Sequence, residues 1–143
     1  MNHTFLWREG VWQASGIFYD EKQKPIQATG RMEVSHLKDA WIAESFLEMD
    51  LNETLRITNR YKINPPSEET TAASWTALNM ALGPIKGNFA IVGDSIFSLF
   101  QTQGGQNGSE YYRKINDNHY HNKGFLLEDG KVISSWEIDW KIK

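Results

Sequence analysis

The chain has 143 residues, a formal net charge of −3 and no cysteine, which predicts one domain of ordinary size and excludes disulfides and thiolate chemistry. Acidic and basic residues are interspersed, so neither a nucleic-acid-binding stripe nor a polybasic membrane patch is expected. Aromatic residues make up 13 % of the chain, more than a small core needs, so some of them are expected to line a cavity.

The N-terminal stretch MNHTFLWREG has no basic flank and no long apolar run, so no signal peptide is expected. It has the composition of a single helical turn with Thr4 as the N-cap. No later stretch approaches the roughly 18 apolar residues of a membrane span. Together with the absence of cysteine, this predicts a cytoplasmic protein, monomeric or homodimeric, without nucleic-acid or membrane partners.

Apolar and polar residues alternate with a period of two along most of the chain, which predicts β-strands. The clearest case is TLRITNRYKI, where Leu55, Ile57 and Tyr61 share one face and charged residues share the other. Short turn signals, such as EDG at 128–130, separate the strand-like runs. The expected strands lie near residues 10–19, 26–36, 40–49, 54–63, 71–82, 85–93, 95–103, 109–116, 119–127 and 131–142.

Residues 67–82, SEETTAASWTALNMAL, carry signals for both helix and strand. The Ser and Glu residues imitate a helix capping box, and Ala, Leu and Met favour helix. The alternation of Trp75, Ala77 and Asn79 and the run of Thr favour strand, which is our prediction. The pattern leaves the strand register across 67–103 open.

Regular antiparallel strands joined by short turns predict either a sandwich or a closed barrel. Roughly ten strands use nearly the whole chain and leave little for long crossover connections. We therefore predict an all-β fold, a single antiparallel up-and-down β-barrel of about 8–10 strands spanning residues 1–143.

The stretch GVWQASG heads the first predicted strand, and its residue sizes suit the closed end of a barrel. Gly10 allows a close approach of the chain, Trp12 fills the tapering end, and Ala14 and Gly16 leave room above it. Gly10-Val11-Trp12 resembles the Gly-x-Trp pattern of the lipocalin and calycin superfamily. The resemblance implies a lipocalin-like barrel with Trp12 as the structural plug, preceded by a short helical turn.

The last predicted strand departs from the pattern of many lipocalins, which place an Arg over the plug Trp. SWEIDWKIK offers only Lys141 and Lys143 in its place. With no signal peptide expected and no cysteine, the chain is more similar to cytoplasmic barrels of the fatty-acid-binding or bacterial calycin kind.

The inward faces predicted from the alternation are apolar and aromatic with a few polar points, as in small-molecule sites. We predict these ligand-binding residues: Trp41, Asn59, Tyr61, Trp75, Phe89, Tyr112, His121 and Trp136. No catalytic residue is assigned, and no cofactor is expected.

His119 and His121 share one strand face and could be solvated residues, ligand contacts or metal ligands. No metal site is expected, because a cupin-like set needs a nearby Glu and Glu128 comes too late beside a turn. A haem-binding barrel would need an inward axial ligand, for which His36 and His121 are conceivable. Glu44 and Glu48 share a face that is expected to lie on the surface.

These observations favour binding of a small apolar or aromatic ligand inside the barrel, without chemistry. One alternative is an enzyme that uses the cavity, such as an isomerase, a cyclase or a chromophore lyase, which a buried acid or His in the cavity would favour. A second alternative is a filled barrel acting as a protein-interaction module. Exposed aromatic residues such as Trp7 or Trp140 would favour it.

Overall fold

The computed structural model describes residues 2–67 and 71–142, and within them every regular element is a β-strand. The ten strands are β1 (Gly10–Tyr19), β2 (Pro25–His36), β3 (Trp41–Asp50), β4 (Thr54–Ile63), β5 (Ala72–Asn79), β6 (Gly83–Val92), β7 (Ser95–Thr102), β8 (Asn107–Asn116), β9 (His119–Glu128) and β10 (Lys131–Ile142). The prediction of strand within residues 67–82 is confirmed by β5, and residues 68–70 of that run lie outside the described residues. Within the described residues, no helix is long and apolar enough to cross a membrane.

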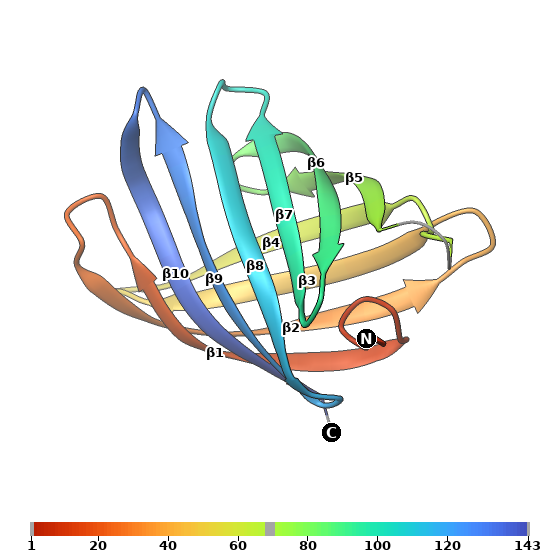
Figure 1. The fold of residues 1–143 in the computed structure, drawn as a ribbon. Helices are drawn as coiled ribbons and strands as arrows, with labels where there is room; N and C mark the ends of the chain where they lie inside the picture. Colours follow the sequence, from red (N-terminus) through yellow and green to blue (C-terminus); the bar gives the residue numbers. More distant parts are fainter. Residues whose placement is uncertain (1, 68–70, 143) are drawn as a thin grey trace.

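Each strand pairs antiparallel with its neighbours in sequence, and β1 pairs with β10, so the sheet closes on itself (Figure 1). The predicted all-β up-and-down barrel is therefore confirmed. Closure removes the two free edges of an open sheet, although part of β4 has no partner in β5. The shortest pairing joins β4 to β5, where only Asn59–Ile63 of β4 have partners in β5. At its other end β4 is paired with β3 alone, apart from a bond from the Met80 N–H to the Thr58 carbonyl (3.0 Å).

The N-terminal segment, residues 2–9, closes one end of the barrel (Figure 1). Phe5 is fully buried and packs on Trp12 and Tyr112, with ring centroids 5.2 Å and 4.6 Å away. Trp12 is also fully buried, as expected of a plug. An edge-to-face contact of Phe5 with Trp12 and its stacking on Tyr112 thus seal this end.

Polar contacts fasten the N-terminal segment to the turns around it. His3 Nε2 faces the Gly93 carbonyl at 3.0 Å and therefore carries the proton, so Nδ1 accepts from the Tyr120 hydroxyl at 2.7 Å. The single turn expected here is present, with a bond from the Arg8 N–H to the Thr4 carbonyl. The sequence predicted Thr4 as the N-cap of that turn, but its hydroxyl instead donates to the Asp117 carbonyl at 2.6 Å.

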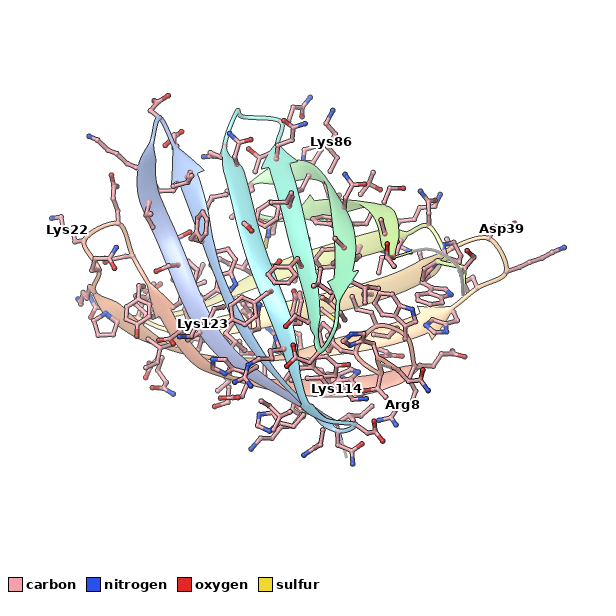
Figure 2. All side chains as sticks on the ribbon, in the orientation of Figure 1. Arg8, Lys22, Asp39, Lys86, Lys114 and Lys123 are labelled. Carbon is pink, nitrogen blue, oxygen red and sulfur yellow. The ribbon has the colours of Figure 1, made fainter. Side chains whose placement is uncertain are left out.

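The charged residues labelled in Figure 2 lie outside the barrel or at its ends. In Figure 2, Lys22 lies at the end opposite the N-terminal segment, and Arg8 and Lys114 lie at the end that the segment covers. The predicted outward placement of Glu44 and Glu48 is confirmed, since they pair with Arg60 and Arg56 on the outer face of β4.

Gly16 leaves room for a neighbouring strand, not for a ligand, contrary to the sequence interpretation. A side chain at Gly16 would collide with the Glu137 carbonyl and would lie 2.7 Å from the Ile138 Cα atom. Both atoms belong to the backbone of β10, which cannot move aside as a side chain can. The glycine therefore permits the close approach of β1 and β10 that completes the barrel.

Candidate ligand-binding cavity

A cavity of about 230 Å³ lies inside the barrel. Its apolar lining comes from Phe18, Met32, Leu47, Met49, Ile57, Trp75, Ala81, Leu82, Ile85, Phe100, Leu126, Trp136, Ile138 and Trp140. Its polar lining comes from Ser45, Asn59, Tyr61, Asn79, Glu110, Tyr112, Asn122 and Ser134. Apolar walls with a few polar groups are the usual composition of a small-molecule site.

The turn between β5 and β6 borders the cavity at the end opposite the N-terminal segment. Ala81 and Leu82 of this turn contribute to the lining. The Asn79 side chain holds the turn, because its Oδ1 accepts the N–H groups of Ala81 (2.8 Å) and Leu82 (2.9 Å). The turn adjoins the part of β4 that has no partner in β5, so the cavity lies beside the least paired seam of the barrel.

Glu110, from the inner face of β8, is the acidic residue of the described lining, and its whole residue is 9 % exposed. Its Oε1 accepts hydrogen bonds from Asn122 Nδ2 at 3.1 Å and Trp136 Nε1 at 3.3 Å. Asn122 is held in turn by the Tyr111 carbonyl (2.9 Å) and the Trp140 indole N–H (3.5 Å). The carboxyl group therefore has a fixed set of N–H donors from β9 and β10.

Burial sets the protonation behaviour of the cavity. Burial raises the pKa of Glu110, although hydrogen bonds from Asn122, Tyr112 and Trp136 act in the opposite direction. Burial, and then the negative charge of Glu110, raise the pKa of both Tyr61 and Tyr112. Both phenols therefore stay protonated at neutral pH. No Lys, Arg or His contributes to the cavity lining within the described residues.

Two buried polar atoms of lining residues have no hydrogen-bond partner among the described residues. They are Asn59 Oδ1, which accepts, and Trp75 Nε1, which donates. Buried polar groups in native proteins are nearly always paired, so unpaired ones call for an explanation. A molecule bound in the cavity could supply partners to both.

Gly124 creates the space in which Trp136 reaches Glu110. Gly124 of β9 and Trp136 of β10 are paired directly across the two strands. A Cβ atom on Gly124 would lie 2.5 Å from the Trp136 ring and 2.6 Å from the Glu110 Cβ atom. A glycine opposite a large ring thus lets the indole lie across the neighbouring strand and donate to the carboxyl group.

The structure brings five of the predicted ligand-binding residues together in the cavity lining: Asn59, Tyr61, Trp75, Tyr112 and Trp136. Trp41 does not line this cavity, because it stacks on His36 near the plugged end, with centroids 3.9 Å apart. Phe89 is buried against Trp75 and also lies outside the lining.

His121 lies on the outer face of β9, because Tyr120 and Asn122 take the inner face. His119 Nε2 and His121 Nδ1 lie 2.8 Å and 3.2 Å from Asp139 Oδ1. Partial burial would raise the pKa of Asp139, but these two hydrogen bonds outweigh it and the pKa is lowered. Within the described residues no group of three His, Cys, Asp or Glu suits a metal ion. His36, the other conceivable haem ligand, donates to the Leu6 carbonyl at 2.9 Å.

Sequence reasoning missed Glu110 and Asn122. The signal for Glu110 was present, because it lies two residues before Tyr112, which the prediction had placed inward. Asn122 was missed because placing His121 inward puts its neighbour on the outer face. A shift of one residue exchanges the two faces of a strand.

No protein-family model and no curated protein sequence matches the chain. Among solved structures, it is similar to an S-type phycobiliprotein lyase, CPES, from Guillardia theta. The TM-score is 0.66 at 8 % sequence identity, over 97 % of this chain and 90 % of the lyase chain.

Two further structures match with TM-scores of 0.29, too low to indicate a shared fold. One is a Nitrosomonas europaea protein described as an AttH (12 % identity, 91 % of this chain and 48 % of that chain). The other is an N-terminal dehydratase from the difficidin assembly line (8 % identity, 97 % and 80 %). The ten-stranded closed barrel and its likeness to the lyase structure fit a calycin-like barrel fold.

Proposed function

We propose that the chain binds a small apolar or aromatic molecule inside its barrel. The cavity of about 230 Å³ is the observation that carries this proposal, since it combines aromatic walls with a polar cluster around Glu110. A barrel whose interior is filled by side chains would serve as an interaction module. That alternative is less well supported, because Trp140 is buried and Trp7 packs against Trp41. The cytoplasmic location stays a prediction from the sequence.

The cavity volume limits the ligand to about one or two rings. It lies below the range of roughly 300–1,000 Å³ for drug-sized ligands. At about 30 Å³ for each water-sized unit, it holds roughly eight non-hydrogen atoms. A linear tetrapyrrole, with four rings, would require the barrel to open.

A thermal-shift and tryptophan-fluorescence screen of one- and two-ring aromatic compounds tests the proposal. Binding should raise the melting temperature with ligand concentration and change the fluorescence of Trp75 and Trp136. Ser45→Leu should fill part of the cavity and abolish the shift, whereas Thr76→Leu, on the outer face of β5, should retain it. If no compound shifts the wild type, the binding proposal is wrong.

The buried carboxyl group favours a second candidate, an enzyme that uses the same cavity. A carboxylic acid with a raised pKa beside two phenol hydroxyls is suited to general acid catalysis. The likeness to a phycobiliprotein lyase concerns the fold alone at 8 % identity, so no reaction is transferred from it. This candidate can be tested by incubating the protein with each compound that binds and then looking for a chemically changed compound by mass spectrometry. Conversion by the wild type that Glu110→Gln loses would support it.

A further inference from the structure

We infer that the ligand of this cavity carries a protonated nitrogen, which pairs with Glu110 among the aromatic walls. The inference rests on the proposed binding function and names the chemical class of the ligand. A small aromatic amine, in its ammonium form, is the simplest molecule of this class that suits the cavity volume.

The cavity contains an acid without a protein cation. Glu110 lines it, and no Lys, Arg or His does so within the described part of the chain. A buried carboxylate is costly unless a positive charge and hydrogen bonds accompany it. Asn122 and Trp136 supply hydrogen bonds to Glu110, so the component that the protein does not supply in the described lining is a positive charge.

The donors around Glu110 are arranged for a carboxylate. Asn122 Nδ2 and Trp136 Nε1 both donate to Oε1, and an indole N–H can only donate. The Tyr112 hydroxyl hydrogen-bonds with the same carboxyl group, so three neutral donors surround the carboxylate with which a bound cation would pair. The groups that face Glu110 and titrate are Tyr61 from β4 and Tyr112 from β8, and both stay neutral because burial raises their pKa. A cation from the ligand would restore the charged form of Glu110 that burial disfavours.

Asn59 supplies a second acceptor. Its Oδ1 is buried and has no partner among the described residues. Tyr61 hydrogen-bonds with Asn59, and the charge of Glu110 raises the pKa of Tyr61. The three side chains are therefore close to one another. An ammonium group has three donors and no acceptor, so it matches two acceptors better than a hydroxyl group does. The unpaired Trp75 N–H would additionally favour a ligand that bears an oxygen.

The aromatic walls suit the same class of ligand. Tyr61, Trp75 and Phe100 form one ring cluster, with centroids 5.1 Å apart for Tyr61 and Trp75 and 6.0 Å apart for Trp75 and Phe100. Rings of this kind attract cations through their faces and pack against an aromatic ligand.

Isothermal titration calorimetry with three probes of equal size tests the inference: phenethylamine, 2-phenylethanol and propylbenzene. The wild type should bind phenethylamine at least about tenfold more tightly than 2-phenylethanol. Glu110→Gln, which keeps an acceptor for Asn122 and Trp136, should lose this preference and retain the affinity for the alcohol within about threefold. Glu44→Gln removes the same charge from the outer face and should leave the preference unchanged.

A second measurement uses the wild type alone. Titrations in buffers of different ionisation enthalpy should show proton release when phenethylamine binds, because Glu110 loses its proton while the amine keeps its own. The affinity for phenethylamine should therefore rise as the pH increases from 4.5 towards the raised pKa of Glu110, while that for 2-phenylethanol stays flat or falls.

Equal affinities for the three probes, or an amine preference that Glu110→Gln retains, would overturn the pairing with Glu110 and leave the binding function in place. If none of the three probes binds the wild type, propylbenzene included, the proposed binding function fails with it for ligands of this size.

Discussion

Glu110 is the residue at which burial and charge oppose each other most directly. The folded chain withdraws its carboxyl group from water and gives it neutral donors, so its pKa lies above the ordinary value of 4.5. Between 4.5 and that raised pKa the folded state holds more protons than the unfolded state. The contribution of Glu110 to the free energy of unfolding therefore falls as the pH rises through this window, and it levels off above the raised pKa.

Glu110→Gln removes this titration while preserving the shape of the side chain. The variant should be as stable as the wild type near pH 4.5 and increasingly more stable towards pH 8, by about 1.4 kcal/mol for each unit by which the pKa is raised. Urea denaturation across this range measures the difference. Parallel pH profiles for the two proteins would show that the carboxyl group is not desolvated, and Glu44→Gln provides the exposed control.

Gly124 is the residue on which the position of the Trp136 indole depends. Gly124→Ala places a methyl group within 2.6 Å of the Trp136 ring and the Glu110 Cβ atom, so one of them must move. We expect a loss of about 1–3 kcal/mol in the free energy of unfolding, as for overpacked cores. Gly104→Ala, whose nearest contact would be at 3.6 Å, should cost far less. Equal losses for both variants would contradict the close packing at Gly124.

At the scale of elements, the N-terminal segment closes one end of the barrel together with Trp12, although it forms no strand. Phe5 contacts side chains from β1, β8, β9 and β10, so it ties together strands from both ends of the chain. The bonds of His3 and Thr4 to the surrounding turns hold it in place.

Phe5→Ala should lower the free energy of unfolding by about 3–5 kcal/mol, because a fully buried ring is lost and a cavity remains. Chemical denaturation followed by tryptophan fluorescence measures the loss. Trp7→Ala is the comparison, since Trp7 is only partly buried and its loss should cost less. A loss below about 1 kcal/mol for Phe5→Ala would place the segment outside the cooperative core.

At the scale of the whole molecule, closure of the barrel leaves the seam between β4 and β5 as its least paired part. Residues 54–58 of β4 have no partner in β5, and the turn that follows β5 borders the cavity. We therefore predict that a molecule enters the cavity at this seam.

Hydrogen exchange followed by mass spectrometry can test this route. Peptides that cover residues 54–58 and the β5–β6 turn should exchange faster than peptides from β9, whose residues are paired on both sides. A ligand that binds in the cavity should slow exchange at the seam more than elsewhere. Uniform slowing across the barrel would indicate that the seam is not the entrance.

The sequence by itself determined the strands and most of their inward faces. Alternation with a period of two is a local property of an extended chain, so it placed Asn59, Tyr61, Trp75, Tyr112 and Trp136 inward without reference to other strands. Short turns between long strands left little choice beyond a closed barrel. The position of Trp12 at the head of β1 predicted its burial.

Only the tertiary structure decided which residues meet. The contact of Glu110 with Asn122 and Trp136 depends on the register of β8, β9 and β10, and on the space left by Gly124. His121 was placed inward because no local signal separates two faces that are both part polar, and burial of Tyr120 and Asn122 resolved it. The volume of the cavity likewise depends on side chains from distant strands, which alternation along one strand does not specify.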